Sequence, residues 1–257
     1  MKFNNYIIVI LALLLCFTSK VAGQEKAKGE FSHKIVVGYH LGGTMPIPLP
    51  REVRKISSYW PQFTPQLGYN ISYQAGERWS LESGITLDWK GMGARDEVKY
   101  MYTKVIYGGD EIQGYFTGKN ETRVKIAYAT LPVRIAYDLN PTWKIRGGAY
   151  VSYRSSAEFS GTVWDGYLRR VDDNINDIIN SEKIDIPNKN DATFDFGKEM
   201  RNFDMGVSLG FEHIFPGRFG IYGDLTYSLT PIFPSSFTGV DMKMRNIYFV
   251  IGASYRL

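Results

Sequence analysis

Apolar and polar residues alternate along most of this 257-residue chain. From residue 247 to the chain end one face is wholly apolar, while the opposite face carries Gly252, Ser254 and Arg256. A period of two residues indicates a β-strand. Strands with one apolar and one polar face are typical of barrels whose outside meets lipid and whose inside is wet.

The pattern predicts eight strands. They lie near 33–42, 60–75, 79–90, 122–139, 143–154, 201–213, 219–230 and at the carboxyl terminus. Turns at 76–78, 140–142 and 215–218 are short, whereas polar connections near 43–59, 91–121, 155–200 and 231–243 are long. Short turns on one side and long loops on the other are typical of outer-membrane barrels with periplasmic turns. We therefore predict an all-β fold, an eight-stranded antiparallel up-and-down transmembrane β-barrel with four long extracellular loops.

Two of the long connections leave alternatives open. Lys99–Ile106 and Gly114–Lys119 also alternate, so they could add a hairpin that makes ten strands, or extend existing strands above the membrane. In the connection 155–200, apolar residues recur at roughly helical spacing from Asp165 to Lys183. This spacing predicts a short surface helix, placed on the barrel rim or against a partner.

The first 23 residues have the pattern of a secretory signal peptide, with Lys2, an apolar run and small residues before Gln24. We expect the barrel domain to occupy residues 24–257. The single cysteine, Cys16, lies inside the apolar run. Cleavage would therefore leave a mature chain without disulfides, thiol nucleophiles or cysteine-ligated metals.

Composition agrees with a barrel in a membrane. The net charge is +4, from 30 Lys and Arg against 26 Asp and Glu, so we expect no nucleic-acid partner. The mean hydropathy of −0.22 is too polar for a helical membrane protein. It is usual for a barrel, because only every second strand residue touches lipid. Outer-membrane lipid is therefore the expected surroundings of the outer face.

Tryptophans mark the predicted edges of the lipid-facing surface. Trp79 and Trp89 lie ten positions apart on one face, which at roughly 3.3 Å per residue and a tilt of about 40° spans about 25 Å. Trp143 and Phe219 are expected in the periplasmic girdle with one of them, and Trp60 in the outer girdle. A soluble barrel, the alternative, would leave this apolar belt in water.

Charged side chains of both signs, nearly matched in number, are predicted on the inner face. An eight-stranded barrel is just wide enough for side chains to fill, and buried charges need partners. We therefore expect a network of salt bridges and hydrogen bonds that fills the lumen, with a proton or ion pathway as the alternative. The expected members are Lys34, Glu82, Asp88, Arg134, Asp138, Arg146, Asp204, Glu212, Asp224 and Arg256.

Candidate chemistry is sparse. His40 and Asp88 both face inward near the predicted outer rim and form a possible acid–base pair, but no serine nucleophile is clearly positioned beside them. A network role for His40 is the better interpretation. The acidic run at 172–176 begins like a calcium loop, yet Asp177 and Lys183 stand where Gly and Glu are required. We expect no catalytic residue, metal or cofactor.

Residues 30–257 resemble the PorT-like outer-membrane β-barrel domain family of Bacteroidetes-type bacteria. The resemblance rests mainly on the layout of the whole chain, and also on the signal peptide before Gln24, on Ala129–Tyr137, a strand with a proline between aliphatic residues, and on the chain end. There Gly252, Tyr255 and Leu257 are similar to the carboxyl-terminal signal that the barrel-assembly machinery reads, although Leu257 replaces an aromatic residue. The resemblance implies an outer-membrane barrel and no catalytic residue.

These observations predict a non-enzymatic outer-membrane barrel with a filled lumen and a structural or surface-interaction role through its long loops. An accessory role in a protein secretion complex is the first alternative. A lipid- or peptide-modifying enzyme or a small pore are further ones. The expected partners are the barrel-assembly machinery during insertion and, in the mature state, envelope or secretion proteins.

Overall fold

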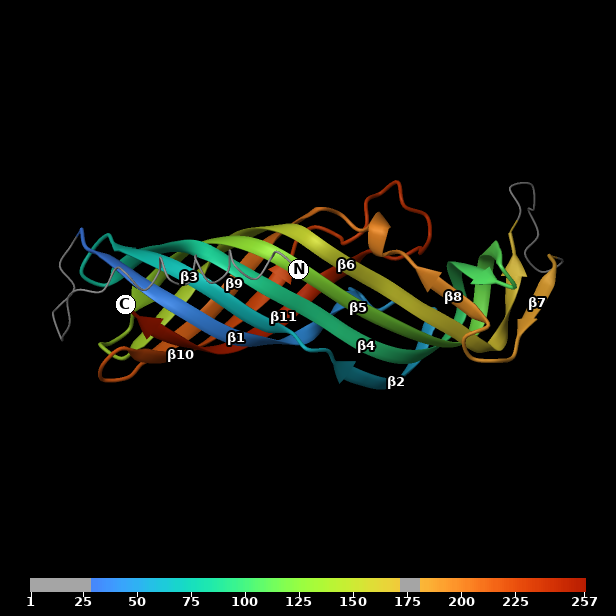
Figure 1. Ribbon diagram of the computed structural model, residues 1–257, viewed down its shortest axis with the longest axis horizontal. Coiled ribbons are helices and arrows are strands. Elements are labelled where there is room, and N and C mark those ends of the chain that lie inside the picture. Colours follow the sequence, from blue (N-terminus) through green and yellow to red (C-terminus); the bar gives the residue numbers. More distant parts are fainter. Residues whose placement is uncertain (1–28, 172–180) are drawn as a thin grey trace, which may run out of the picture.

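The computed structural model describes residues 29–171 and 181–257, and these residues are almost entirely β-strand (Figure 1). Within them, no helix has the length and apolar character needed to cross a membrane. The elements are β1 (Phe31–Pro46), β2 (Val53–Pro61), β3 (Pro65–Gln74), β4 (Trp79–Tyr107), β5 (Asp110–Asp138), β6 (Trp143–Arg170), β7 (Lys183–Ile186), β8 (Ala192–Asp195), the 3-10 turn η1 (Gly197–Glu199), β9 (Phe203–Ile214), β10 (Phe219–Ser228) and β11 (Met244–Arg256).

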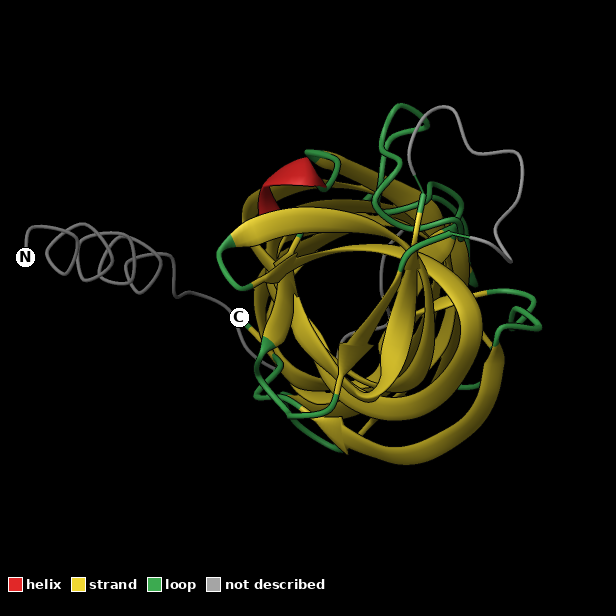
Figure 2. Ribbon diagram, turned by 90° about the vertical axis from the view of Figure 1, so that its right-hand side faces the viewer, coloured by secondary structure: helices red, strands yellow, loops and turns green. Residues whose placement is uncertain are grey.

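Eight of these strands form a closed ring, which Figure 2 shows end-on. The order is β4-β3-β1-β11-β10-β9-β6-β5, and β5 pairs with β4 to complete the circle. Every pairing in the ring is antiparallel. The first and last strands meet along their whole length, from Lys34 opposite Arg256 to Pro46 opposite Met244. The prediction of an eight-stranded antiparallel up-and-down barrel is confirmed.

Three strands continue far beyond the length that a membrane requires. At roughly 3.3 Å per residue, the 29 residues of β4 measure about 95 Å, whereas about 9–11 tilted residues cross a bilayer. β5 has 29 residues and β6 has 28. We call their distal parts, residues 91–126 and 155–170, the extension. It projects to the right in Figure 1.

The extension corrects the prediction of long polar loops at 91–121 and 155–200, and the strands β1 and β2 correct the prediction of a loop at 43–59. Residues 91–107 and 110–121 are a hairpin of β4 and β5, so the strand-extension alternative holds and the ring does not gain two strands. The hairpin turns at Gly108 and Gly109, whose φ angles of 62° and 96° suit glycine. Two glycines between alternating segments are a hairpin signal in the sequence.

Two further predictions need correction. The expected helix from Asp165 is wrong for its first part, because residues 165–170 belong to β6 and pair with β5 and β7. Its remainder falls mostly within 172–180, outside the described residues. The expected strand 60–75 is interrupted at 62–64, where the backbone of Thr64 instead binds His40. Trp60 therefore lies in β2, which pairs with β4 outside the ring.

Short elements close the extension into a tube. β8 pairs with β6 at Ser160–Val163 and with β4 at Ile106 and Tyr107, so it bridges the two outer strands of the hairpin sheet. An isolated bridge joins Thr103 of β4 to Val240 in the connection between β10 and β11. The extension is therefore an enclosed structure with its own interior.

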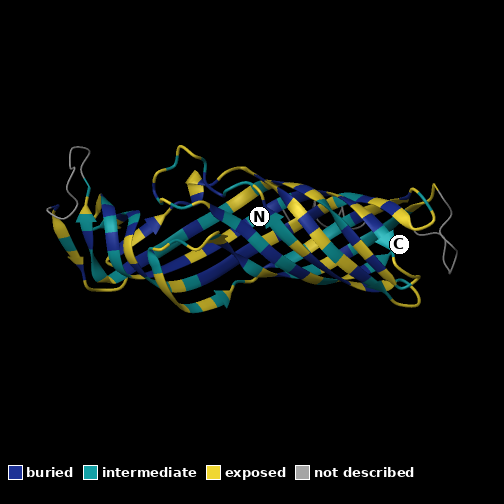
Figure 3. Cartoon of the chain, turned by 180° about the vertical axis from the view of Figure 1, so that it is seen from behind, coloured by how far each residue is buried: buried dark blue, intermediate teal, exposed yellow. Residues whose placement is uncertain are grey.

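The interior changes character along the long axis. In the membrane part, apolar side chains point outward and polar ones inward, so buried and exposed residues alternate along the strands (Figure 3). In the extension, the inward side chains are apolar: Met92, Val98, Met101, Val105, Ile112, Phe116, Val124, Ile126, Phe159, Val163 and Leu168. The interior of the membrane part, called the lower interior from here on, is thus polar. The interior of the extension, called the upper interior, is an ordinary hydrophobic core.

Candidate functional site

The outer face of the ring carries a continuous apolar surface. Along β4 the exposed residues run from Trp79, 53% exposed, to Trp89, 40% exposed. Trp79, Trp143 and Phe219 are the first residues of β4, β6 and β10, so they lie at one end of the barrel. Trp79 packs against Tyr137 with ring centroids 4.6 Å apart, and Phe219 against Tyr255 at 5.0 Å. Trp89 lies at the other edge of this surface.

The lower lumen holds an ionic network. The fully buried carboxylate of Glu82 forms ion pairs with Lys34 at 3.4 Å, Lys144 at 3.3 Å and Arg146 at 3.6 Å. Glu212 lies 2.6 Å from Lys34 and 3.4 Å from Arg146. The network therefore links five strands of the ring, β1, β4, β6 and β9 through charges and β11 through Ser254, which donates to Glu212 at 2.7 Å.

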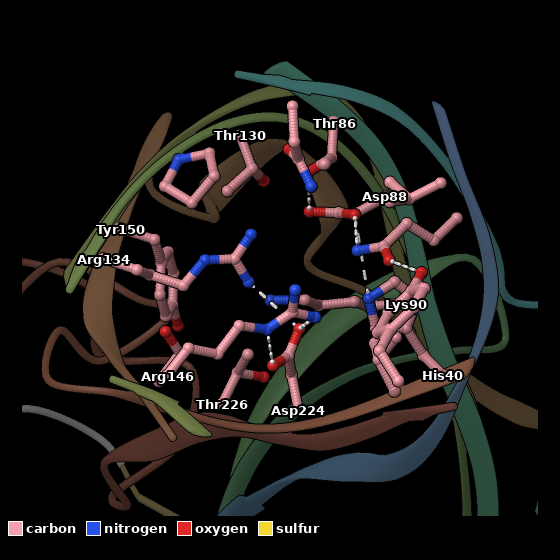
Figure 4. A pocket seen from close by; sticks show the side chains of 17 residues that line it. His40, Thr86, Asp88, Lys90, Thr130, Arg134, Arg146, Tyr150, Asp224 and Thr226 are labelled. Carbon is pink, nitrogen blue, oxygen red and sulfur yellow. Dashed lines mark hydrogen bonds and ion pairs between the residues drawn. The ribbon is translucent and has the colours of Figure 1, made fainter. Parts of the chain in front are cut away.

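Arg146 is the centre of the network, and Figure 4 shows its contact with Asp224. Its guanidinium donates two hydrogen bonds to Asp224, at 2.8 and 2.7 Å. Arg134 reaches the same carboxylate at 3.0 Å. The Arg146 guanidinium also lies 5.0 Å from the centroid of the Tyr222 ring. Arg146 thus lies within ion-pair distance of three carboxylates in the middle of the barrel, those of Glu82, Glu212 and Asp224.

Tyr222 explains why Gly252 is a glycine. Gly38 and Gly252 face each other across β1 and β11, and a Cβ on either one would collide with the Tyr222 side chain. The Tyr222 hydroxyl donates to Gln66 at 2.6 Å. Gly252 therefore has a packing reason within the barrel. At the same chain end, the backbone N–H of Leu257 donates to the carbonyl of His33 at 3.0 Å.

Three of the predicted network residues lie at its margins. Asp138 reaches Lys144 at 3.7 Å near the barrel end. Arg256 lines the end of the lumen beside Arg218, and it forms no ion pair within the described residues. Asp204 lies higher in the barrel, where Asn246, Ser228 and Thr230 donate hydrogen bonds to it. The structure thus brings the other predicted residues together around Arg146 and Asp88.

Lys90 is a member of the interior that the sequence analysis did not include in the network. Its ammonium lies 5.3, 5.2 and 5.7 Å from the ring centroids of Tyr128, Tyr150 and Tyr248, and 3.9 Å from Asp204. Cation–π contacts of this kind stabilise a desolvated ammonium. The three tyrosine rings around Lys90 lie where the polar lumen meets the apolar core. Alternation places Lys90 on the same face as Asp88, which is the signal that could have found it.

His40 and Asp88 lie side by side, with Nε2 of His40 3.8 Å from the carboxylate. Nδ1 of His40 lies 3.3 Å from the Thr64 carbonyl, an acceptor, which fixes the proton on Nδ1. Asp88 accepts hydrogen bonds from Gln66 at 2.7 Å and Thr86 at 3.1 Å. The pair adjoins a cavity of about 40 Å³, room for a few waters at about 10–15 Å³ each. Within residues 29–171 and 181–257, no serine side chain forms a hydrogen bond with His40.

No group of three or more His, Cys, Asp or Glu side chains could hold a metal ion in the part of the chain that the structure describes.

Aromatic rings fill the upper interior. The ring of Phe159 on β6 lies 6.2 Å from Phe194 on β8, 6.2 Å from Phe196 and 5.1 Å from Phe233. Phe196 in turn packs on Phe237 at 5.1 Å. We call these five residues the phenylalanine cluster. It joins the extension to the connection between β10 and β11.

The buried carboxyl of Asp96 is expected to make the stability of the extension depend on pH. Burial raises the pKa of its carboxyl from 3.8 to about 6, and the Asn120 amide at 3.0 Å offsets only part of that shift. A raised folded-state pKa means that ionisation opposes folding. The penalty is absent below about pH 3.8, grows as the pH rises towards 6 and then stays at about 2–3 kcal/mol.

Asp96→Asn is therefore expected to stabilise the extension by about 2–3 kcal/mol at pH 7.5 and by almost nothing below pH 4. Urea unfolding of both proteins at the two pH values, followed through protease cleavage of the extension, measures the difference. An Asn variant with the same advantage at both pH values would contradict the assignment.

The fold and the site define an integral outer-membrane β-barrel: an eight-stranded ring, an apolar outer surface edged by aromatic residues and a charged, filled lumen. Residues 22–234 match the model of the family described as outer membrane protein beta-barrel domain, and the chain belongs to that family. Its place in the cell is the outer membrane. A comparison with curated proteins finds no match.

Solved structures with a similar arrangement are also outer-membrane barrels. Ail, the attachment invasion locus protein of Yersinia pestis, is 12% identical with a TM-score of 0.36, over 90% of this chain and 100% of that one. OprG from Pseudomonas aeruginosa is 13% identical with a TM-score of 0.38, over 90% of this chain and 98% of that one.

Proposed function

We propose that this protein is a non-enzymatic outer-membrane barrel that holds the extension outside the cell as a rigid interaction platform. The observation that carries the proposal is the closed extension, with its own hydrophobic core and a β8 strand that seals it. A barrel needed only to span the membrane requires none of these residues. An ordered, cored projection is suited to present a fixed surface to a partner.

The proposed barrel does not conduct. Two barriers in series support this: the ionic network around Arg146 below, and the phenylalanine cluster above. Because the charges around Arg146 are paired with one another, the movement of one side chain does not open a path through the network. The small-pore alternative predicts discrete current steps, and single-channel recording in planar bilayers is expected to show none.

Partners follow from the two exposed ends. Envelope or secretion proteins are the proposed partners of the extension. Gly252, Tyr255 and Leu257 are proposed as the signal for the barrel-assembly machinery, in addition to the packing role of Gly252. We also propose membership of the PorT-like group of Bacteroidetes-type bacteria, supported by Ala129–Tyr137 and by the chain end. We also propose that the signal peptide is cleaved after residue 23.

A trimmed variant tests the platform. Gly93 pairs with Arg123, and the N–H of Arg154 donates to the carbonyl of Asn202 at 2.8 Å, so residues 94–122 and 155–201 can each be replaced by an Asn-Gly turn. The trimmed barrel is expected to keep its mobility shift between unboiled and boiled samples in detergent gels. It is expected not to restore the function of the full chain in cells that lack it.

The control replaces only Gly108 and Gly109 with Asn-Gly, which keeps the extension. Full restoration by the trimmed barrel would refute the platform. If secretion fails while envelope integrity survives, the extension serves a secretion complex; loss of integrity with normal secretion indicates a structural role.

A further inference from the structure

The outer face of β5 changes from apolar to charged at the end of the lipid-facing surface. Leu131, Ala129 and Ala127 are followed at the next outward positions by Lys125 and Arg123. At roughly 3.3 Å per residue and a tilt of about 40°, these two cations lie about 5–10 Å above the last apolar position. This is the level at which lipid headgroups meet the protein.

Three cations converge there on one carboxylate. Glu121 is 3% exposed, and it accepts hydrogen bonds from Arg95 on β4 at 2.6 Å, from Arg123 at 2.8 Å and from Lys189 at 2.7 Å. Burial raises the pKa of Glu121, but these hydrogen bonds outweigh burial and hold the pKa at about 2. Glu121 is therefore ionised at neutral pH, and the four residues carry two excess positive charges.

The neighbouring rows of the sheet have no such excess. Below, Lys125 pairs with Glu158 at 3.0 Å, and above, Lys119 pairs with Asp165 at 2.8 Å. Positive charge is thus concentrated in the one row where a buried carboxylate orients the cations. Glu121 acts here as an anchor for the cations, because one carboxylate cannot neutralise three of them.

The three cations keep unused donors towards the outside. The side chains of Arg95, Arg123 and Lys189 are 48%, 55% and 37% exposed. Arg95 uses its Nε on Glu121, which leaves its terminal nitrogens directed elsewhere. Trp60 lies 5.5 Å from Arg95, and Trp164 lies 4.9 Å from Lys189. The rings limit the motion of both cations. An anion that binds them therefore costs little further side-chain conformational entropy.

We propose that this basic cluster, Arg95, Arg123 and Lys189 around Glu121, binds the phosphorylated headgroup of a glycolipid in the outer leaflet. Guanidinium groups match phosphate oxygens, and the flanking tryptophans suit contact with sugar rings. Only the Lys125–Glu158 pair separates the cluster from the lipid-facing surface, and this closeness to lipid favours a lipid over a soluble anion. Beneath the cluster, Ala129 stands between Leu87 on β4 and Tyr153 on β6, and Ala127 stands between Trp89 and Ser156. The small alanine side chains let an acyl chain approach the β5 backbone closely.

Native mass spectrometry of the full chain in detergent micelles tests the proposal, with bisphosphorylated lipid A as the probe. The triple variant Arg95→Gln, Arg123→Gln, Lys189→Gln is expected to lower the affinity for this probe tenfold or more. The matched control is Lys99→Gln, Lys104→Gln, Lys183→Gln, which removes the same charge from the distal part of β4 and from β7. It is expected to stay within twofold of the wild type.

A second comparison needs no variant. Dephosphorylated lipid A is expected to bind the wild-type chain as weakly as the phosphorylated lipid binds the triple variant. An equal loss in both triple variants would reduce the effect to net charge and overturn the proposal. Equal binding of the dephosphorylated lipid would overturn it as well, and so would competition by inorganic phosphate at the concentration of the lipid. Each variant is first checked for the mobility shift of a folded barrel.

Discussion

Replacement of Arg146 with Met is expected to lower the free energy of unfolding of the barrel by about 3–5 kcal/mol. Arg146 is 2% exposed, and its guanidinium faces the carboxylates of Asp224, Glu82 and Glu212. A methionine has similar reach and no charge. With Asp138, which also pairs with Lys144, four carboxylates would then share only Lys34, Lys144 and Arg134. Asp224 would also lose its two shortest hydrogen bonds. An uncompensated buried charge is the costly outcome.

Urea unfolding in lipid vesicles, followed by the mobility shift between folded and unfolded forms, measures this loss. The control is Arg123→Met, which removes a half-exposed arginine of the extension and is expected to cost less than about 1 kcal/mol. The double variant Arg146→Met, Asp224→Leu removes a pair and is expected to recover part of the loss. A loss below about 1 kcal/mol for Arg146→Met would show that the network contributes little to stability.

The ring of eight strands could be predicted because lipid imposes a strict rule on every strand that crosses it. Outward positions from Trp79 to Trp89 are apolar except for Ser83, whose hydroxyl donates to the carbonyl of Pro132, so the period of two is easily seen. The extension obeys the opposite rule. Its apolar residues face inward, and an irregularity between Val98 and Met101 moves the inward positions from even to odd numbers. A search for a constant lipid-facing side therefore sees polar loops in this part of the chain.

The lumen shows a different limit. Alternation correctly assigns Arg146 and Asp224 to the inner face, but they are 78 residues apart in sequence. Which inward charges meet depends on the stagger of the strands around the ring, and alternation carries no information about stagger. The same holds for Glu121, whose partners Arg95 and Lys189 come from other elements. Sequence reasoning thus supplies the residues of a network and geometry supplies its pairs.

The phenylalanine cluster predicts that the extension can be loosened without unfolding the membrane barrel. Phe159→Ala is expected to destabilise the extension by about 3–5 kcal/mol, because a ring that is 3% exposed and packed on three other rings leaves a cavity. β8 and the connection between β10 and β11 would lose their common contact. The ionic network around Arg146 shares no residue with the cluster, so the ring below it should persist.

Limited proteolysis of the protein in vesicles separates the two parts. In the Phe159→Ala protein, cleavage within the extension is expected to accelerate by two orders of magnitude or more, since about 1.4 kcal/mol corresponds to a factor of ten when opening is in rapid equilibrium. The mobility shift of the barrel should remain. Phe63→Ala serves as the control, because Phe63 is 83% exposed and its loss should change neither readout. Loss of the mobility shift in Phe159→Ala would contradict the independence of the two interiors, and it would mean that the extension and the barrel fold as one cooperative unit.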